Sequence, residues 1–407
     1  MSSNAITRTT KSDGKPAVTP KLRFPEFRDT EGWKLKSLQD ASVPVVERVG
    51  QRKLTPVSIS AGIGFVPQSE KFGRDISGNQ YQLYTLVRDG DFVFNKGNSI
   101  KFPQGCVYLL QGWGQVAAPN VFICFRLKDG YSNGFFQNCF EQNQHGKQLK
   151  KDITSGARSN GLLNINKKTF FSIELQVPSL AEQQKIADCL SSVDELIAAQ
   201  ARKVDAIESH KKGLMQQLFP CEGETQPRFR FPGFEDDWND GQLEALCVSV
   251  SSGKDQRKAD GAFNLYGSTG IIGKTERPSY NAPHILVARV GANAGHLTRA
   301  TGQFGVTDNT LVINLKPAVN MDFIFYYLEN ININKLIFGS GQPLITGTIL
   351  KNLQIVVPDA LEQQRIANCL ISLDALIAAQ TKKLDSLKSH RKGLRQQLFP
   401  SQDEVEA

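Results

Sequence analysis

A 43-residue segment occurs twice in this chain of 407 residues, and the duplication constrains the fold more than any other feature. Residues 178–220 recur as residues 358–400, with 27 of the 43 aligned positions identical. A shorter echo precedes each copy: PKLRFPEF at 20–27 matches PRFRFPGF at 227–234, and Trp33 or Trp238 follows. Because internal repeats mark repeated structural units, the sequence predicts two half-proteins in tandem. Each consists of a Phe-Pro lead-in, a globular domain and the repeated segment.

Each repeated segment has the pattern of one long helix. A capping box begins each copy, Ser179 with Glu182 and Asp359 with Glu362, and a proline ends it. Apolar residues then recur in steps of three and four, which is the spacing of a coiled-coil seam. The predicted helix seam is Ile186, Leu190, Val193, Ile197, Gln200, Val204, Ile207, Leu214, Leu218, Ile366, Leu370, Leu373, Ile377, Gln380, Leu384, Leu387, Leu394 and Leu398.

The two helices are expected to pair with each other. An apolar stripe on a helix of about 41 residues cannot face water, and its own copy is the obvious partner. Such a helix spans about 60 Å, which exceeds the width of a domain of this size and disfavours packing on its own domain alone. Gln200 and Gln380 then fit as register devices in the seam, which Lys211 and Arg391 interrupt at equivalent positions.

The globular segments show short alternating apolar runs separated by turn residues, which favour strands. Strands are predicted at 91–94, 107–110, 121–125 and 173–177 in the first domain, and at 285–290, 310–315 and 353–357 in the second. A helix is predicted at 326–337. The predicted fold class is α+β: two diverged α/β domains joined by two long antiparallel coiled-coil helices, in a pseudo-two-fold tandem repeat.

These patterns predict six segments along the chain. They are a disordered tail (1–20), a first domain with its Phe-Pro lead-in (21–177), a long central helix (178–220), a linker with the second domain (221–357), a long C-terminal helix (358–400) and an acidic tail (401–407).

The charge is unevenly distributed. The chain carries a net charge of +8, and residues 34–177 hold 18 Lys and Arg against 10 Asp and Glu, whereas residues 239–357 hold 10 against 8. This surplus in the first domain is consistent with a polyanion partner.

Other features of composition indicate the compartment. The seven cysteines form no C-x-x-C pair and no Cys/His cluster, which favours free thiols in a reducing cytoplasm. No run of 18 apolar residues is present, so no membrane span and no membrane partner are expected.

Catalytic motifs are missing from the sequence. It contains no Asn-Pro-Pro-aromatic or Asp-Pro-Pro-Tyr motif and no G-x-G-x-x-G, and its histidines lack the spacing of metal ligands. Residues 268–275 resemble a phosphate-binding loop, but Ser268 stands where glycine is needed and no helix is expected to follow, so a turn-rich loop is predicted. The chain is therefore expected to be non-catalytic, with no metal site.

The organisation resembles the specificity (S) subunit of Type I restriction-modification systems. The resemblance rests on the P-x-x-x-E-Q-Q-[KR]-I-A helix starts at Pro178 and Pro358, the Q-Q-L-F-P helix ends and the Phe-Pro lead-ins. In the second domain, residues 265–273 and 285–291 look like stretches common in the family's target recognition domains. The likeness covers nearly the whole chain after the tail.

The resemblance implies a DNA-binding subunit of a restriction system. Each domain would read one half of a bipartite asymmetric site in double-stranded DNA. The helices would set the spacer between the half-sites and dock two modification (methyltransferase) subunits, which recruit restriction (translocase/nuclease) subunits. Methylation and cleavage, together with S-adenosylmethionine, ATP and Mg, would belong to those partner subunits.

Comparison of the two halves gives candidate base contacts, because Arg, Lys, Asn and Gln read guanine and adenine edges in the major groove. The DNA-binding candidates are Lys96, Asn120, Arg158, Ser268, Arg289, Asn309 and Gln342. The alternative is that Asn120 and Asn309 serve turns and that the cationic candidates contact phosphate. Lys147, Lys150, Lys151, Lys167 and Lys168 are expected to touch phosphate or water.

Two other functional classes stay open from sequence alone. A coiled-coil scaffold without sequence-specific DNA binding explains the helices but not the charged first domain or the two diverged domains. A self-sufficient DNA enzyme lacks any supporting motif.

Overall fold

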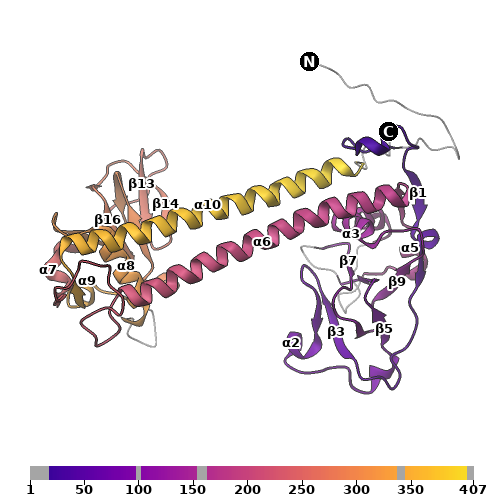
Figure 1. Ribbon diagram of the computed structural model, residues 1–407, viewed down its shortest axis with the longest axis horizontal. Helices are drawn as coiled ribbons and strands as arrows, with labels where there is room; N and C mark the ends of the chain where they lie inside the picture. The colour runs from indigo at the N-terminus through magenta and orange to yellow at the C-terminus, as the bar shows by residue number, and fades with distance from the viewer. Residues whose placement is uncertain (1–17, 98–101, 154–162, 337–343, 401–407) are drawn as a thin grey trace, which may run out of the picture. The chain divides into compact units, whose positions relative to one another are not determined.

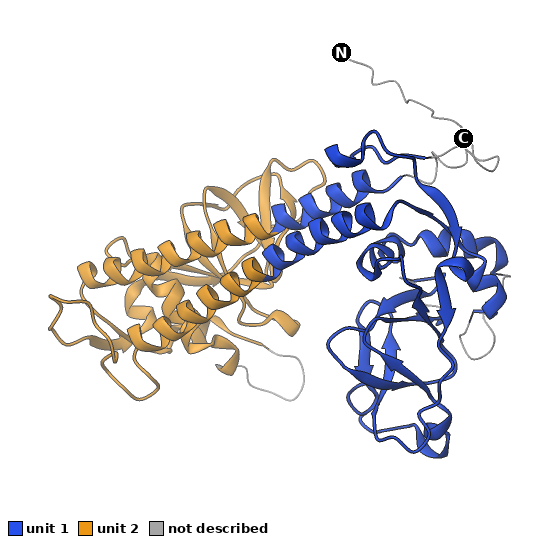
Figure 2. Ribbon diagram, turned by 45° about the vertical axis from the view of Figure 1, so that its right-hand side comes forward, with its two compact units in different colours: residues 1–198, 385–407 blue, residues 199–384 orange. Residues whose placement is uncertain are grey.

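The computed structural model describes residues 18–97, 102–153, 163–336 and 344–400. The chain divides into two compact units, residues 1–198 with 385–407 and residues 199–384 (Figure 2). Each unit contains one globular domain and part of both long helices. The division between the units thus cuts both helices, whereas the segments predicted from the sequence kept each helix whole.

The two repeated segments form the long helices α6 (Leu180–Leu218) and α10 (Ala360–Leu398), of 39 residues each (Figure 1). Within unit 1 the start of α6 packs with the end of α10, since Ile186 and Leu398 share one core. Within unit 2 the end of α6 packs in the same way with the start of α10, through Leu218 and Ile366. The helices are therefore antiparallel in each unit, which confirms the predicted pairing.

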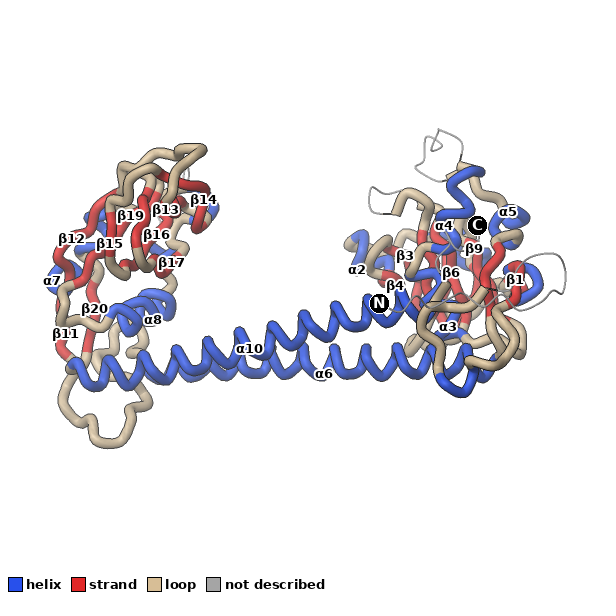
Figure 3. Tube along the Cα trace, turned by 90° about the horizontal axis from the view of Figure 1, so that it is seen from above, coloured by secondary structure: helices blue, strands red, loops and turns tan. Residues whose placement is uncertain are grey.

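The first domain is built mainly from short strands, drawn red in Figure 3. Its strands are β1 (Lys34–Ser37), β2 (Ser42–Pro44), β3 (Thr55–Ser60), β4 (Gly64–Pro67), β5 (Thr85–Arg88), β6 (Asp91–Asn95), β7 (Cys106–Leu109), β8 (Gln115–Ala118), β9 (Ile123–Leu127) and β10 (Glu174–Val177). Its helices are η1 (Pro25–Phe27), α1 (Leu38–Ala41), α2 (Gln68–Phe72), η2 (Gly78–Leu83), α3 (Asn133–Glu141), α4 (Gln144–Leu149), η3 (Lys150–Asp152) and α5 (Lys167–Phe171).

The second domain has a similar set of short strands and helices. Its strands are β11 (Asn239–Gln242), β12 (Cys247–Ser252), β13 (Phe263–Gly267), β14 (Gly270–Thr275), β15 (Tyr280–Asn281), β16 (His284–Ala288), β17 (Leu297–Ala300), β18 (Gln303–Val306), β19 (Thr310–Leu315) and β20 (Gln354–Val357). Its helices are α7 (Leu243–Leu246), η4 (Gly291–Asn293), α8 (Met321–Ile331), η5 (Ile333–Leu336) and α9 (Gly347–Lys351).

The two domains share one topology, strand for strand. The sheet β2-β9-β6-β7 corresponds to β12-β19-β16-β17, the sheet β4-β3-β8-β5 to β14-β13-β18-β15, and the pair β1-β10 to β11-β20. Even the parallel pairing of β3 with β8 recurs between β13 and β18. The predicted tandem repeat is thus confirmed in domains whose sequences show little of it.

Each core joins a domain to the ends of both helices. In unit 1, Phe399 from the end of α10 stacks on Phe135 of α3 and meets Trp33 edge-on. In unit 2, Phe219 from the end of α6 packs on Phe323 of α8, which also meets Trp238. The phenylalanine of each Q-Q-L-F-P ending therefore anchors the helix in the domain of the other half of the sequence.

Three predictions about local structure need correction. The helix predicted at 326–337 begins earlier, at Met321, where Asn320 caps α8 by accepting from the Phe323 N–H at 2.9 Å. It is interrupted after Ile331 and continues as η5 over Ile333–Leu336. The turn-rich loop predicted at 268–275 is a turn only at its first residues, since Gly270–Thr275 is strand β14. The predicted strand at 121–125 is displaced to Ile123–Leu127.

No helix in the described part of the chain is long and apolar enough to cross a membrane.

Candidate nucleic-acid interface

The glutamate of the first helix-start motif holds the Phe-Pro lead-in. Glu182 is buried, and its carboxylate accepts from Arg23 Nε at 2.8 Å, from Arg23 Nη2 at 2.7 Å and from Trp33 Nε1 at 3.2 Å. Of the predicted capping box only one half forms, in which the Glu182 N–H donates to Ser179 Oγ at 3.4 Å. The glutamate side chain is turned instead toward an arginine 159 residues away.

Unit 2 repeats this arrangement with the equivalent residues. Glu362 accepts from Arg230 Nε at 3.0 Å, from Arg230 Nη2 at 2.7 Å and from Trp238 Nε1 at 3.1 Å. Beside the arginine, the lead-in pairs with the end of the other helix: the Phe229 N–H donates to Gln217 O at 2.9 Å, as the Leu22 N–H donates to Gln397 O at 2.9 Å in unit 1. Lead-in, domain and helix pair are thus fixed together at the same point in both units.

The neighbouring glutamine of each motif joins the helix start to the domain. Gln183 donates to Pro178 O at 3.0 Å and accepts from the N–H of Ser132, the N-cap residue of α3, at 2.9 Å. Gln363 does the same with Pro358 O and with the N–H of Asn320, the N-cap residue of α8. The E-Q-Q signature therefore has a positioning role that the sequence alone did not reveal.

The predicted seam residues face inward. All eighteen are buried or half-buried. In unit 2, Gln200 Nε2 donates to both Gln380 O and Gln380 Oε1 at 3.0 Å, so the two predicted register residues contact each other.

The two cations that interrupt the seam form ion pairs across it. In unit 2, Lys211 pairs with Asp374 at 2.7 Å. In unit 1, Arg391 pairs with Asp194 and with Glu141 of α3. Asp194 and Asp374 are repeat equivalents, so the ion pair is duplicated with the helix.

Three of the DNA-binding candidates meet at one edge of the second domain. The Arg289 N–H, just after β16, donates to Asn309 O at 2.9 Å, and the Thr307 N–H donates to Tyr266 O at 3.0 Å. The turn that contains Asn309 therefore lies beside both Arg289 and the hairpin turn of Ser268. Asn309 is exposed, and Arg289 and Ser268 are half-buried.

One nitrogen of the Arg289 guanidinium lacks a hydrogen-bond partner among the described residues. It is Nε, which is buried. Leaving a buried donor unpaired costs about 1–3 kcal/mol.

The corresponding candidates of the first domain are less closely joined. Lys96 follows β6 as Arg289 follows β16, and it is half-buried. Asn120 is exposed before β9, and its side-chain oxygen accepts from Arg48 and from Thr85 Oγ1. The structure thus gives Asn120 a partner within its own domain, which fits the alternative role in a turn.

Arg158 and Gln342 lie outside the described residues. Their segments rejoin the described chain at equivalent points: the Leu163 N–H donates to Lys96 O and the Ile345 N–H donates to Arg289 O, both at 2.9 Å.

The cationic side chains of the first domain fall into two groups. Arg52 and Arg88 pair with Glu47, and Arg126 pairs with the fully buried Asp91. The five lysines predicted to touch phosphate are all exposed, on α4, on η3 and at the start of α5: Lys147, Lys150, Lys151, Lys167 and Lys168. The side chain of Gln148 on α4 bonds both backbone groups of Glu174, which follows α5 closely in the chain, so these lysines belong to one side of the domain.

The second domain carries a cationic group that the sequence analysis missed. We call it the loop cluster: Lys254, Arg257, Lys258, Lys274 and Arg277, all exposed, on the β12–β13 loop, on β14 and just after β14. The Gly253 N–H donates to Thr310 O, and the Asp255 N–H donates to Val306 O, so the loop runs beside the turn of Asn309. Three carboxylates, Asp255, Asp260 and Glu276, share these segments, which leaves a net charge of +2.

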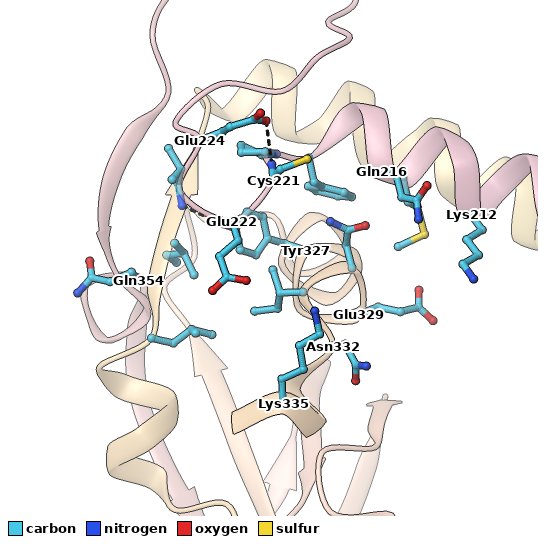
Figure 4. A pocket seen from close by; sticks show the side chains of 18 of the residues that line it. Lys212, Gln216, Cys221, Glu222, Glu224, Tyr327, Glu329, Asn332, Lys335 and Gln354 are labelled. Atoms are coloured by element: carbon cyan, nitrogen blue, oxygen red, sulfur yellow. Dashed lines mark hydrogen bonds between the residues drawn. The ribbon is translucent and has the colours of Figure 1, made fainter. Parts of the chain in front are cut away.

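An acidic groove lies elsewhere in unit 2, between the end of α6, the following linker, α8 and β20 (Figure 4). Apolar side chains such as Phe219 and Tyr327 contribute to it. Its charged lining comprises six carboxylates and three lysines: Glu208, Glu222, Glu224, Asp240, Glu329, Asp374, Lys211, Lys212 and Lys335. The net negative charge of this lining disfavours phosphate.

Reactive groups are few in the described part of the chain. No cluster of three or more His, Cys, Asp or Glu side chains could hold a metal ion there. All seven cysteines are free, and burial raises the pKa of the Cys124 thiol to about 12 and that of the Cys247 thiol to about 11. Burial also lowers the pKa of His145 to about 4, so this histidine is neutral at pH 7.

The chain contains two copies of one sheet scaffold, each fixed to the ends of both long helices and each with a different set of exposed cations. Residues 74–209 and 235–389 match the family described as Type I restriction modification DNA specificity domain. These matches cover well over half of the chain, which therefore belongs to this family.

Named relatives agree with this assignment. The chain is 25% identical over 275 residues to the specificity subunit of the Type I restriction enzyme EcoprrI of Escherichia coli, covering 63% of this chain and 65% of the relative. It is 25% identical over 274 residues to the MjaVIII specificity subunit of Methanocaldococcus jannaschii, covering 59% and 64%. The chain thus spans a little under two thirds of each relative.

Solved structures share the fold. The S subunit of a Type I restriction-modification system from M. genitalium has a TM-score of 0.58 at 14% identity, covering 94% of this chain and 100% of that one. A structure described as addressing complex assembly and conformational transition of the type I R-M system has a TM-score of 0.56 at 16% identity, covering 91% and 98%.

Proposed function

We propose that this chain is the DNA sequence-specificity subunit of a Type I restriction-modification complex. Each domain reads one half of a bipartite asymmetric site in double-stranded DNA, and the helices set the spacer. The observation that carries the proposal is the contrast within the repeat. The two domains share their topology strand for strand, whereas the side chains at their sheet edges differ, as expected of one scaffold carrying two specificities.

The edge of the second domain supports base reading there. Arg289, Asn309 and Ser268 lie close together, and Asn309 is exposed. An arginine donates two hydrogen bonds to guanine O6 and N7 in the major groove. The loop cluster beside it would contact phosphates and so orient the domain without specifying sequence.

The chemistry of restriction and modification would come from partner subunits. Two modification subunits would dock on the helix region and recruit restriction subunits, and they would use S-adenosylmethionine, ATP and Mg. The acidic groove of unit 2 supports docking of protein rather than DNA at that end of the helix pair, because its carboxylates outnumber its lysines.

Domain exchange tests the proposal. The full chain is purified with the modification subunits of its host, and its methylated sites are mapped. Replacing residues 34–177 by the equivalent domain of a relative should change one half of the target and leave the other intact. The control exchange of residues 239–357 should change only the other half.

Two outcomes would contradict the proposal. A change in both halves after a single exchange would exclude independent reading. If binding to mixed-sequence DNA lacked the steep fall with salt that phosphate neutralisation produces, the chain would be a scaffold without DNA.

A further inference from the structure

The β13–β14 hairpin exposes two adjacent isoleucines. Ile271 is 56% exposed and Ile272 is 37% exposed. In the described residues from β11 to β20, the one other exposed large hydrophobic side chain is Val248, on β12. Single exposed apolar residues are normal, but a neighbouring pair at a hairpin tip calls for an explanation.

A β-bulge produces the pair. Tyr266 pairs with Ile271 and Leu265 pairs with Gly273, so Ile272 is the extra residue without a cross-strand partner. Neighbouring side chains of a regular strand point to opposite faces of the sheet. Without the bulge, the two isoleucines would therefore lie on opposite faces. A bulge re-aims a side chain locally, and here Ile271 is mostly in solvent while Ile272 keeps an exposed part although it lies over Gly267, where a Cβ would be 2.7 Å from Ile272 Cδ1.

The loop cluster is built onto this hairpin. The Lys258 N–H donates to Lys274 O at 2.8 Å. A Cβ at Gly261 would lie 2.5 Å from the Thr275 backbone, and one at Gly273 would lie 2.9 Å from Arg257 Nε. The two glycines thus permit close approach, which brings the cations of the loop beside the apolar tip.

The first domain exposes an isoleucine in the same hairpin. Ile63, in the turn between β3 and β4, is 76% exposed. Tyr108 of β7 stabilises this turn, because its Oη accepts from the Gly62 N–H at 2.6 Å. An exposed isoleucine at this tip is therefore kept in two domains whose sequences have otherwise diverged.

We propose that the β13–β14 tip enters the major groove of the half-site read by the second domain, where Ile271 and Ile272 contact thymine methyl groups. The loop cluster holds the flanking phosphates. The inference rests on the proposed function and adds the base that the hairpin recognises. The major groove admits a two-stranded β-ribbon, and the C5 methyl of thymine is the apolar group displayed there.

Charge and size favour DNA over a protein at this tip. Two isoleucines supply much less apolar surface than the roughly 800 Å² that each partner buries in a standard protein interface. Cations beside a small apolar tip match phosphates beside a base methyl group.

The test uses the full chain in complex with the modification subunits of its host. Its preferred site is selected from duplexes with randomised half-sites. In the second half-site each thymine is then replaced in turn by uracil, which lacks only the C5 methyl. We expect the wild type to select thymine at one position or more, and to lose about fourfold in affinity per methyl contact removed.

The double variant Ile271→Ala/Ile272→Ala should bind the thymine duplex about tenfold more weakly and should no longer distinguish uracil from thymine. Ile271 is mostly exposed and Ile272 is partly exposed, and neither belongs to a core, so the variant should fold, which circular dichroism checks. Val248→Ala, an exposed apolar change elsewhere in the domain, should leave binding unaltered. Ile63→Ala should affect only the other half-site.

Three results would overturn the inference: a wild type indifferent to uracil throughout the second half-site, a double variant that keeps the wild-type preference, or a loss of affinity accompanied by DNA bending but no thymine preference. The last would indicate an apolar wedge in the minor groove. Absence of any sequence-specific binding by the wild-type complex would instead refute the proposed function itself.

Discussion

Replacement of Arg230 by leucine should uncouple the second domain from its helix, because Arg230 supplies two of the three side-chain donors to Glu362. The carboxylate of Glu362 is fully buried, whereas 18% of the Arg230 side chain is exposed. In the variant, the charge of Glu362 would remain buried, with the Trp238 N–H as its remaining side-chain donor. Removing one partner of a buried ion pair costs about 3–5 kcal/mol, and we expect a loss of that size.

A second substitution separates the energy of the Arg230–Glu362 ion pair from the effect of losing the arginine side chain. Glu362→Gln removes the buried charge while keeping an oxygen that accepts from Trp238. We expect the double variant Arg230→Leu/Glu362→Gln to lose only about 1–2 kcal/mol, which is at least about 1 kcal/mol less than Arg230→Leu alone, so the two substitutions are not additive.

Hydrogen exchange at the helix starts is the assay. Arg230→Leu should increase amide exchange over residues 360–370 and leave residues 180–190 unchanged, because local opening reports local stability. Arg23→Leu, the matched change in unit 1, should give the opposite pattern. Strict additivity of the two substitutions, or a loss below about 1 kcal/mol for Arg230→Leu, would refute the reasoning that Glu362 is a charged anchor.

Three further predictions follow from the helices and from the first domain. A fragment of residues 1–220 should form a homodimer, in which α6 of one copy takes the place of α10 beside α6 of the other, and with the modification subunits it should recognise a palindrome. Light scattering that shows a monomer at micromolar concentration would exclude the dimer. Adding four residues to both helices at matched seam positions adds about 6 Å, so the spacer preferred in a methylation assay should lengthen by one or two base pairs, and an active variant with the old spacer would contradict the ruler. The pKa of His145, lowered to about 4, lies below its unfolded value of about 6.5, so the unfolded state binds more protons between these values. Stability should therefore fall by about 2 kcal/mol from pH 7 to pH 5, and urea unfolding of His145→Phe should lack this dependence.

The sequence by itself determined the parts of the fold that depend on local pattern. The 3–4 spacing gave both long helices and their seam, since residues on one helix face recur at that period regardless of the rest of the protein. Gln200 and Gln380 occupy equivalent seam positions of the two repeated segments, so pairing of the helices predicted that they meet. Alternation likewise placed strand β19 at Thr310–Leu315, where the structure has it.

Only the tertiary structure decided how the candidate interface is assembled. The sequence suggested a reciprocal capping box at Glu182, but the carboxylate binds Arg23, 159 residues away, because a buried charge requires a full set of partners. The loop cluster joins side chains from different segments whose proximity depends on strand pairing. The bulge at Ile272 depends on the register between β13 and β14. Long-range hydrogen bonds and strand register leave no period in the sequence, so these features became visible only when the chain was folded.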